Sequence, residues 1–573
     1  MLIQQRHPEP TVAPFATNIA DTSDAAPNLG YEPDLSMPAL PYQLPVIVSV
    51  PQTSPLCQEC PFLTEYRKVS SESGYWQAMH RKATEREKTL KETIAELEAK
   101  IRLRERQLFG RKSEKSSTSE KLSGKTQPRR NRGQQPGSPG HGRRSHDHLH
   151  TVEDIIDIPV EERVCSECHL PLSPFPGTED SQEIEIEVKA YRRVIKRKRY
   201  KRTCTCNHLP MVITAPPVPK LIPKSPISVS IWVMVLLSKF LFQQPTQRLL
   251  AQLRLHGLQL CHGTITGGLK KLVPLFEPVV KAIIEKNRSE QQWHADETRW
   301  LVFATLDGKV GHLWYMWVFV SESTVVYCLD PSRSAEVPAS HFGDTCEGFL
   351  IVDRYSAYKK FVKGTRFILC FCWAHQRRDF IELANKWPRI EDWAFSWVKR
   401  ISNLYRLNDL RLAQEKGSND YARADMILKA VADKMVRTRE KQLAQPDLQL
   451  AARKVLESMR KHWKGLTVFL DYPQVSMDNN TGERALRNQA VGRKNYYGSG
   501  SIWSGLLSAN LFTIFQTLQL CGINLKVWLS AFLRECARNG GKAPDDISSW
   551  LPWNMSAQQR QTFSLKPAIQ DSS

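Results

Sequence analysis

The sequence predicts a multidomain α+β protein whose largest domain is an α/β core with a helical insertion. Three observations predict this fold class. The chain has 573 residues, more than one hydrophobic core usually serves. Runs of apolar, aromatic and β-branched residues are concentrated in residues 293–372, whereas helical periodicity marks 75–108, 226–286 and 391–470. A stretch rich in Gly, Pro and basic residues separates the first helical block from the rest, which indicates a linker.

The composition points to a polyanionic partner. Lys and Arg number 80 against 59 Asp and Glu, which gives a formal net charge of +21. This surplus favours nucleic acid over a membrane, because the most apolar run, Ile227–Phe242, contains Lys239 and is too short to span a bilayer. The first residues lack the basic-then-apolar order of a signal peptide. We therefore expect a cytoplasmic protein whose 13 cysteines are thiols or metal ligands.

The N-terminal part is expected to contain little globular structure. Residues 1–74 lack periodicity and are predicted to be disordered, with Cys57 and Cys60 as free thiols rather than half a zinc site. Residues 75–108 carry an apolar seam with alternating steps of three and four, which predicts a coiled coil and a homo-oligomer; a helical hairpin within one chain is the alternative. Residues 109–150 form a basic Gly/Pro linker that either contacts phosphates or only adds solubility.

Residues 151–220 are predicted to form a small zinc-binding β module. Cys165 pairs with Cys168, and Cys204 with Cys206, on either side of a strand-like segment at 183–199. Four thiolates in two close pairs can hold a structural Zn²⁺ in tetrahedral geometry, although a neighbouring histidine can replace one of them. The basic and aromatic residues between the pairs suit a DNA backbone, and a merely solvated ribbon is the alternative.

Residues 221–288 are predicted to form a helical DNA-binding region. A helix around Leu249–Leu253 is followed by a turn at Gly257 and by a second helix that runs from Thr264 through Leu272. This is the outline of a helix-turn-helix, but any helical hairpin has the same outline.

The segment after residue 288 predicts an RNase H-like α/β core. Three strands, a helix, a fourth strand, a second helix and a fifth strand are expected in that order within residues 289–390. A helical insertion at 391–470 follows, then a catalytic helix region at 471–515 and a C-terminal helical region and tail at 516–573.

Three acidic residues stand where this topology would bring them together. Asp296 lies within the first strand, Asp353 ends the fourth, and Glu483 opens a later helix. Three converging carboxylates can hold two Mg²⁺ (or Mn²⁺) ions, which activate a nucleophile and stabilise the leaving oxygen at a phosphodiester. The alternatives are an ion pair of Asp296 with Arg299 and helix capping by Asp353.

Other polar residues surround these acids in the sequence. Asn479 and Asn480 either orient Glu483 or only build its turn, and His375 is expected to pack at a helix start rather than to bind metal. The predicted DNA contacts are basic residues close to the acids: Arg484, Arg487, Arg493, Lys494, Arg377 and Arg378.

In combination, several of these motifs resemble the IS66-type transposases, a group of bacterial DDE transposases. The resemblance extends from about residue 85 to 550. The motifs that carry it, besides the cysteine pairs, are Leu108–Glu114, Gly133–Gly137, Asp296–Thr298, Val352–Tyr355 with Tyr358, Cys372–His375 with Arg377 and Arg378, Asp478–Glu483 and Arg493–Tyr496.

The resemblance implies a nucleoid-associated DNA transposase with Asp296, Asp353 and Glu483 as its catalytic triad and Mg²⁺ ligands. It would bind double-stranded DNA at the ends of its insertion sequence and at the target, cleave strands and transfer them. Elements of this type often also encode accessory proteins, which are further candidate partners. The sequence departs from the family at the second cysteine pair, which is one residue short, and at Arg354, where a small residue is usual. The alternatives are a noncatalytic transposase-derived DNA-binding protein and an RNase H-like nuclease without strand transfer.

Overall fold

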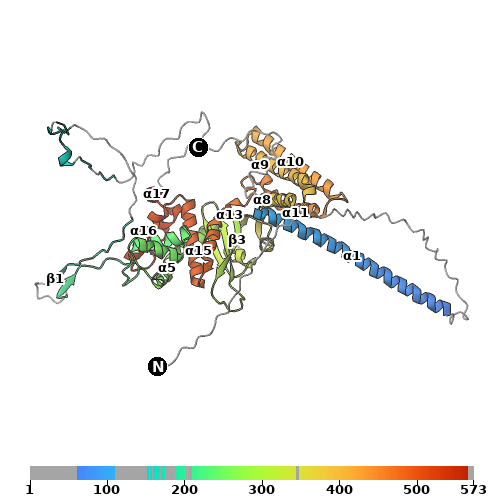
Figure 1. Cartoon of the computed structure of the whole chain (residues 1–573), viewed down its shortest axis with the longest axis horizontal. Coiled ribbons are helices and arrows are strands. Elements are labelled where there is room, and N and C mark those ends of the chain that lie inside the picture. Colours follow the sequence, from blue (N-terminus) through green and yellow to red (C-terminus); the bar gives the residue numbers. More distant parts are fainter. Residues whose placement is uncertain are drawn as a thin grey trace, which may run out of the picture. The chain divides into compact units, whose positions relative to one another are not determined.

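The architecture was analysed in a computed structural model, which describes residues 61–109, 151–174 except 154, 158 and 168, 188–201, 203, 210–343 and 347–564. The chain divides into two units, residues 1–92 and 93–573. The residues described in the first unit all belong to helix α1 (Pro61–Phe109), drawn in blue in Figure 1. Cys57 and Cys60 lie outside the described residues.

Helix α1 begins earlier than the sequence pattern predicted. Residues 61–74, which were expected to be disordered, are helical, because Pro61 suits the first helical position and the following residues need no apolar seam to form a helix. The seam side chains Leu90, Ile94 and Leu97 are exposed. The coiled coil therefore stays a prediction.

The zinc-binding module is only partly described. Cys165 lies in a tight turn in which the His169 N–H donates to the Cys165 carbonyl at 3.0 Å, while Cys168, Cys204 and Cys206 lie outside the described residues. The predicted strand at 183–199 is wrong for its described part: residues 188–198 are not in a strand, and β1 (Arg199–Lys201) pairs antiparallel with β2 (Val212–Thr214). Arg199–Lys201 form a ladder with a neighbouring strand, which is what a strand requires.

A mixed sheet forms the centre of the second unit. Its strand order is β5-β4-β3-β6-β7, in which β3, β4 and β5 are antiparallel and β3, β6 and β7 are parallel. The strands are β3 (Gln292–Val302), β4 (Leu313–Val320), β5 (Val325–Asp330), β6 (Glu347–Val352) and β7 (Arg366–Phe371). Helix α6 (Glu336–Phe342) precedes β6, and α7 (Ser356–Phe361) follows it. This confirms the predicted order of strands and helices and the α+β class.

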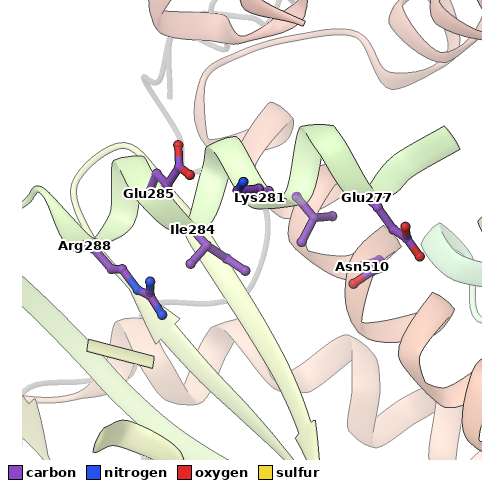
Figure 2. Close-up of a pocket in the computed structure, with 7 residues that line it drawn as sticks. Glu277, Lys281, Ile284, Glu285, Arg288 and Asn510 are labelled. Carbon is purple, nitrogen blue, oxygen red and sulfur yellow. The ribbon is translucent and has the colours of Figure 1, made fainter. Parts of the chain in front are cut away.

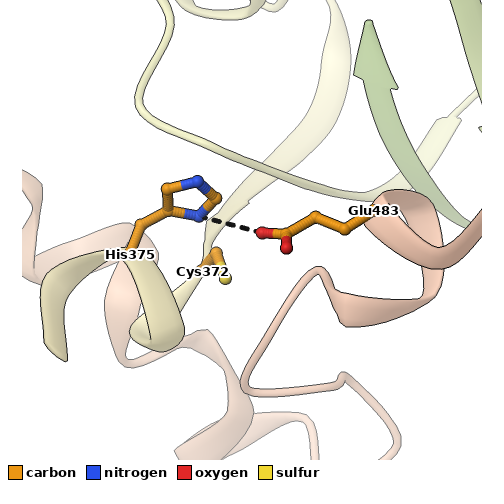
Figure 3. A group of neighbouring side chains, drawn as sticks. All are labelled: Cys372, His375 and Glu483. Carbon is orange, nitrogen blue, oxygen red and sulfur yellow. Dashed lines mark ion pairs between the residues drawn. The ribbon is translucent and has the colours of Figure 1, made fainter. Parts of the chain in front are cut away.

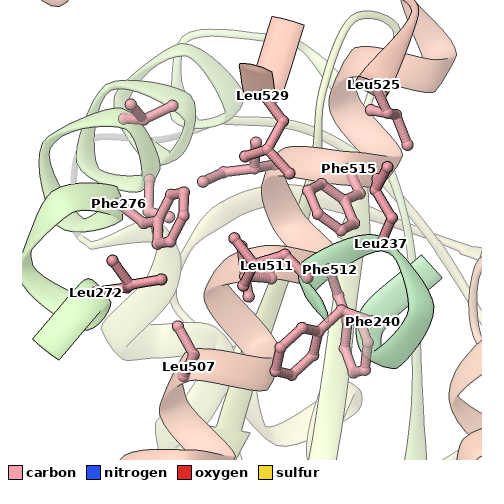
Figure 4. Close-up of a cluster of buried hydrophobic side chains, with 14 of the residues drawn as sticks. Leu237, Phe240, Leu272, Phe276, Leu507, Leu511, Phe512, Phe515, Leu525 and Leu529 are labelled. Carbon is pink, nitrogen blue, oxygen red and sulfur yellow. The ribbon is translucent and has the colours of Figure 1, made fainter. Parts of the chain in front are cut away.

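Alternation along the strands divides the core between the two faces of the sheet. In β3, Trp293 and Ala295 pack on one face and Trp300 and Val302 on the other, because successive side chains of a strand point to opposite faces. The second face is covered by α3 (Val229–Leu236), a π-helical turn (Leu237–Leu241), α4 (Thr246–Leu255), α5 (His262–Arg288), α15 (Ile502–Leu520) and α16 (Leu525–Arg538). Figure 4 shows the side chains of α5, α15 and α16 meeting in this cluster.

Helix α5 belongs to the core of the sheet. It runs on to Arg288, well beyond the predicted end at Leu272, because its apolar face continues through Ile283. Residues 221–288 therefore share one hydrophobic core with β3, β4 and β5. Close packing is visible at Gly268, where an added Cβ would lie 1.8 Å from the Trp232 ring, whereas an added Cβ at the neighbouring Gly267 would meet nothing within 4 Å.

The first face is covered by α6, α7 and the predicted helical insertion. The helices after β7 are α8 (Trp373–Lys386), a 3₁₀ turn (Pro388–Ile390), α9 (Glu391–Leu412), α10 (Asn419–Leu443), α11 (Leu450–Leu466) and α12 (Val468–Asp471). They share a core with Trp293, Trp317 and Phe319 of the sheet. Arg411 of α9 is fully buried and donates to the carbonyls of Phe469 and Leu470 at 2.8 and 3.1 Å, so the insertion holds the segment that leads to Glu483.

The remaining elements complete the second unit. They are a 3₁₀ turn (Val160–Glu162), α13 (Asn480–Ala485), α14 (Arg487–Tyr496), β8 (Gly498–Ser499), two further 3₁₀ turns (Ser548–Trp550 and Pro552–Asn554) and α17 (Ala557–Phe563). In the part of the chain that the structure describes, no helix is both long enough and apolar enough to cross a membrane.

A pocket of about 340 Å³ lies along α5, at its contact with Asn510 of α15. Figure 2 shows its lining, in which Glu277, Lys281, Glu285 and Arg288 bring both signs of charge. None of the three predicted catalytic acids lines this pocket.

Candidate active site

Asp296 lies where one edge of strand β3 loses its partner, and Asp353 and Glu483 lie near enough to raise its pKa. On this edge, β6 pairs with Gln292–His294 and the two-residue strand β8 pairs with Leu301 and Val302. Between these two pairings, side chains of residues 479–493 donate hydrogen bonds to β3 carbonyls that a neighbouring strand would otherwise bind. The Asn479 side-chain amide donates to the Ala295 carbonyl at 2.8 Å, and Arg493 donates to the Arg299 carbonyl at 2.8 Å. Asp296 stands in this gap.

Asn479 fixes the loop that carries Glu483. Its side chain is buried, and its Oδ1 lies 3.1 Å from Nδ1 of His294 while its amide bonds Ala295. Gly482 makes room for it, since an added Cβ there would lie 2.9 Å from Asn479 Oδ1. The Asn479 carbonyl also accepts from the Glu483 N–H at 3.1 Å. Of the two roles that the sequence left open, orienting Glu483 is the one these contacts favour.

Asp296 and Asp353 each hold one carboxylate oxygen by a local hydrogen bond. Asp296 Oδ1 accepts from the Glu297 N–H and Asp353 Oδ1 from the Tyr355 N–H, both at 2.9 Å. Burial is the main cause that raises the pKa of Asp296 to about 7, and the nearby carboxylates of Glu297, Asp353 and Glu483 contribute to this rise. Repulsion among these acids is the electrostatic signature of a site that attracts cations.

Glu297 is a site residue that the sequence analysis missed. It follows Asp296 in β3, so its side chain points to the opposite face of the sheet. There its carboxylate accepts from the Tyr358 hydroxyl at 2.6 Å and from Arg333 Nε at 2.8 Å. Burial raises the pKa of Glu297, and the bonds from Tyr358 and Arg333 oppose that rise. Tyr358 stood out in the motif, but no spacing in the sequence links it to Glu297.

Glu483 in the first turn of α13 faces the start of α8. Its Oε1 lies 3.6 Å from His375 Nδ1, and its Oε2 lies 3.8 Å from the Arg378 guanidinium. Figure 3 shows the carboxylate turned toward the His375 ring, with the Cys372 thiol beside it. His375 was expected only to pack at the helix start; it does begin α8, but it also contacts the predicted catalytic glutamate.

The described residues contain one set of three potential metal ligands whose atoms all lie within 4.8 Å of one another, and it is Cys372, His375 and Glu483. The acids Asp296, Asp353 and Glu483 do not form such a tight set. Two ions roughly 4 Å apart need ligands that are spread more widely than those of a single ion.

The predicted DNA-contact residues fall into two groups. Arg484, Arg487 and Lys494 are exposed, which leaves their charges available to a phosphate backbone. Arg493 instead donates to Thr298 Oγ1 and to the Arg299 carbonyl, so it holds α14 against β3. Of the pair on α8, Arg378 lies near Glu483 and Arg377 is half-buried.

Arg354 is accommodated in this structure by polar partners. It pairs with Asp379 at 2.5 Å and donates to Gln376 and Ser458, at 3.1 and 3.0 Å. The residue after Asp353 thus connects the end of β6 to α8 and α11.

The residues present fit divalent metal binding. Asp296, Asp353 and Glu483 supply carboxylate oxygens, the ligands that Mg²⁺ prefers. Among the described contacts, the Oδ2 atoms of the two aspartates accept no hydrogen bond, which leaves one oxygen of each for a cation. A bound cation would also relieve the repulsion that raises the pKa of Asp296.

Comparison with known proteins gives similar chains and a family. "Uncharacterized protein y4jD" of Sinorhizobium fredii is 26% identical over 431 residues, covering 72% of this chain and 81% of the relative. "Uncharacterized protein y4hP" of the same organism is 25% identical over 444 residues, covering 72% of this chain and 76% of the relative. Residues 224–506 match the model of the family described as "Transposase IS66 family". Through this region, which holds the sheet, the helical insertion and all three acids, the chain belongs to the IS66 family of transposases.

Proposed function

We propose that this transposase binds the ends of its insertion sequence and catalyses metal-dependent strand cleavage and strand transfer. The observation that supports the proposal is the place of Asp296 at the split edge of β3, within electrostatic reach of two further acids. Asp353 and Glu483 both lie close enough to Asp296 to raise its pKa. An RNase H-like core is the description that best suits the strand order and the place of these acids within it.

Asp296, Asp353 and Glu483 would hold the divalent metal. When bound, Mg²⁺ would supply Lewis-acid activation of the attacking oxygen and stabilise the leaving oxygen of the phosphodiester. The protein itself would hold the three carboxylates in position. Hydrogen bonds to the Glu297 and Tyr355 N–H groups fix Asp296 and Asp353, and Asn479 fixes the loop of Glu483. Preorganised carboxylates need no rearrangement when charge develops at the phosphate.

The exposed basic residues near the acids would place the DNA. Arg484 and Arg487 flank Glu483 along the chain, and Lys494 is exposed at the end of α14. Cations at these positions neutralise phosphates without reading sequence. The proposal includes two further parts. Helix α1 would dimerise the protein as a coiled coil, and a structural Zn²⁺ would be held by Cys165, Cys168, Cys204 and Cys206.

The test is a three-way assay with full-length protein, labelled transposon-end DNA and a supercoiled target in Mg²⁺. The wild type should bind ends, cut them and join them to the target. Asp296→Asn should abolish cutting and joining while end binding stays within about twofold, because one charge near the metal is removed and the basic surface is retained. Arg299→Gln, an exposed change three residues along the same strand, is the matched control.

The outcomes separate the proposal from its rivals. Binding without cutting by the wild type would indicate a noncatalytic DNA-binding protein, and cutting without joined products would indicate a nuclease. Unchanged cutting by Asp296→Asn would refute the assignment of the acids.

A further inference from the structure

A second set of metal-binding atoms lies beside the acids. Cys372 Sγ, His375 Nδ1 and Glu483 Oε1 all lie within 4.8 Å of one another. Two of these residues bracket the first turn of α8 and the third belongs to α13, so the set joins two elements (Figure 3). The Trp373 N–H donates to the Met477 carbonyl at 2.9 Å, which joins the start of α8 to the loop that precedes α13.

Two of the three atoms lack a hydrogen-bonding partner. His375 Nδ1 and Glu483 Oε1 are both shielded from solvent and form no hydrogen bond, although they lie 3.6 Å apart. Buried polar atoms are nearly always satisfied, so two unsatisfied atoms that face each other call for an explanation. A cation bound between them would satisfy both.

The donor types select the metal. A thiolate, an imidazole and a carboxylate form a ligand set that Zn²⁺ takes readily, whereas Mg²⁺ prefers oxygen ligands alone. Burial raises the pKa of the Cys372 thiol, and the Asn479 N–H, which donates to Cys372 Sγ at 3.1 Å, opposes that rise. Three protein ligands leave the fourth position of a tetrahedral ion to water.

We propose that Cys372, His375 and Glu483 form a second metal site that takes Zn²⁺ and thereby withdraws Glu483 from the Mg²⁺ site. The inference rests on the proposed function, because Glu483 is also one of the three catalytic acids. Binding displaces the thiol proton of Cys372 to solvent and forms a zinc–sulfur bond without redox change. Zinc would then act as an inhibitor that competes for one carboxylate.

The first measurement counts zinc and does not depend on catalysis. Full-length protein is equilibrated with Zn²⁺ against a chromophoric chelator, and Co²⁺ replaces Zn²⁺ to reveal thiolate ligation by absorption. The wild type should hold one more ion than Cys372→Ser or His375→Gln, whose affinity at this site should fall at least about 100-fold. Cys261→Ser, at an exposed cysteine before α5, is the control and should match the wild type.

The second measurement follows end cleavage in Mg²⁺ while free Zn²⁺ is raised. Wild-type cleavage should fall by about tenfold or more as the extra site fills, and Cys372→Ser should lose this sensitivity. Equal zinc counts in the wild type and both variants would overturn the site. An extra zinc that leaves wild-type cleavage unchanged would overturn the withdrawal of Glu483. Absence of any Mg²⁺-dependent cleavage would count against the proposed function alone, since the zinc count still tests the site.

Discussion

Replacing Asn479 with Ala tests whether this residue holds the catalytic loop to the sheet. The substitution removes the side-chain bonds to the Ala295 carbonyl and to His294 Nδ1, at 2.8 and 3.1 Å, and leaves both partners buried. A buried polar group without a partner costs about 1–3 kcal/mol, so we expect the free energy of local opening to fall by about 2–4 kcal/mol. At about 1.4 kcal/mol per factor of ten, the population of the open loop rises roughly 30- to 700-fold.

Amide hydrogen exchange measures this opening directly. The Glu483 and Leu486 amides, which donate to carbonyls at 479 and 482, should exchange faster by that factor. End cleavage should also fall by about 100-fold, because a displaced catalytic group loses its alignment. Asn480→Ala is the matched control. The hydrogen bond from Asn480 to Asp478 comes from the backbone N–H, so this substitution keeps it. Equal exchange and equal cleavage in the two variants would refute the reasoning.

Three further predictions concern the core, the response to acid and the DNA contacts. Gly268→Ala should lower the free energy of unfolding by about 1–3 kcal/mol because its Cβ meets a buried indole, whereas Gly267→Ala should raise it by about 0.5–1 kcal/mol; urea unfolding compares them. Burial lowers the pKa of His341 to about 3. As pH falls below about 6.5, this histidine is therefore protonated in the unfolded chain while it stays neutral in the folded one. The contribution of His341 to the free energy of unfolding should drop by about 2 kcal/mol between pH 7.5 and 5. It is measured as the difference between the wild type and His341→Gln, because Asp296, whose raised pKa acts in the opposite direction, is present in both proteins. Lys494→Ala should weaken DNA binding and reduce its salt slope by about 1, whereas Arg493→Ala should lower cleavage and leave the slope unchanged, as filter binding at several salt concentrations would show.

The strand order was predictable because the strands are long and strongly patterned. Leu313–Val320 is almost wholly apolar and aromatic, and the acids at 296 and 353 mark a strand and a strand end. The two-residue strand β8 could not be predicted, since Gly498 and Ser499 carry no periodicity. Nor could the sequence show that α5 shares the core of the sheet, because an apolar helical face does not specify what it packs against.

The sequence singled out the three acids of the proposed site, but it could not predict the contacts around them. Asp296, Asp353 and Glu483 follow from topology and motif, whereas the approach of His375 to Glu483 joins residues 108 positions apart and depends on how α8 meets α13. Arg493 was predicted to contact DNA because of its charge; its two bonds to β3 depend on the gap between β6 and β8. Charge alone does not distinguish the two uses.

The distances along the chain between the acids also bear on protein synthesis. The third acid follows the second by 130 residues, and the β8 segment that closes the sheet comes later still. A ribosome that stops anywhere in the helical insertion releases a product with the basic N-terminal regions and two acids but without Glu483. Such truncated chains would also lack α15 and α16, which complete the hydrophobic core on one face of the sheet, so the fold and the proposed site both depend on translation beyond the insertion.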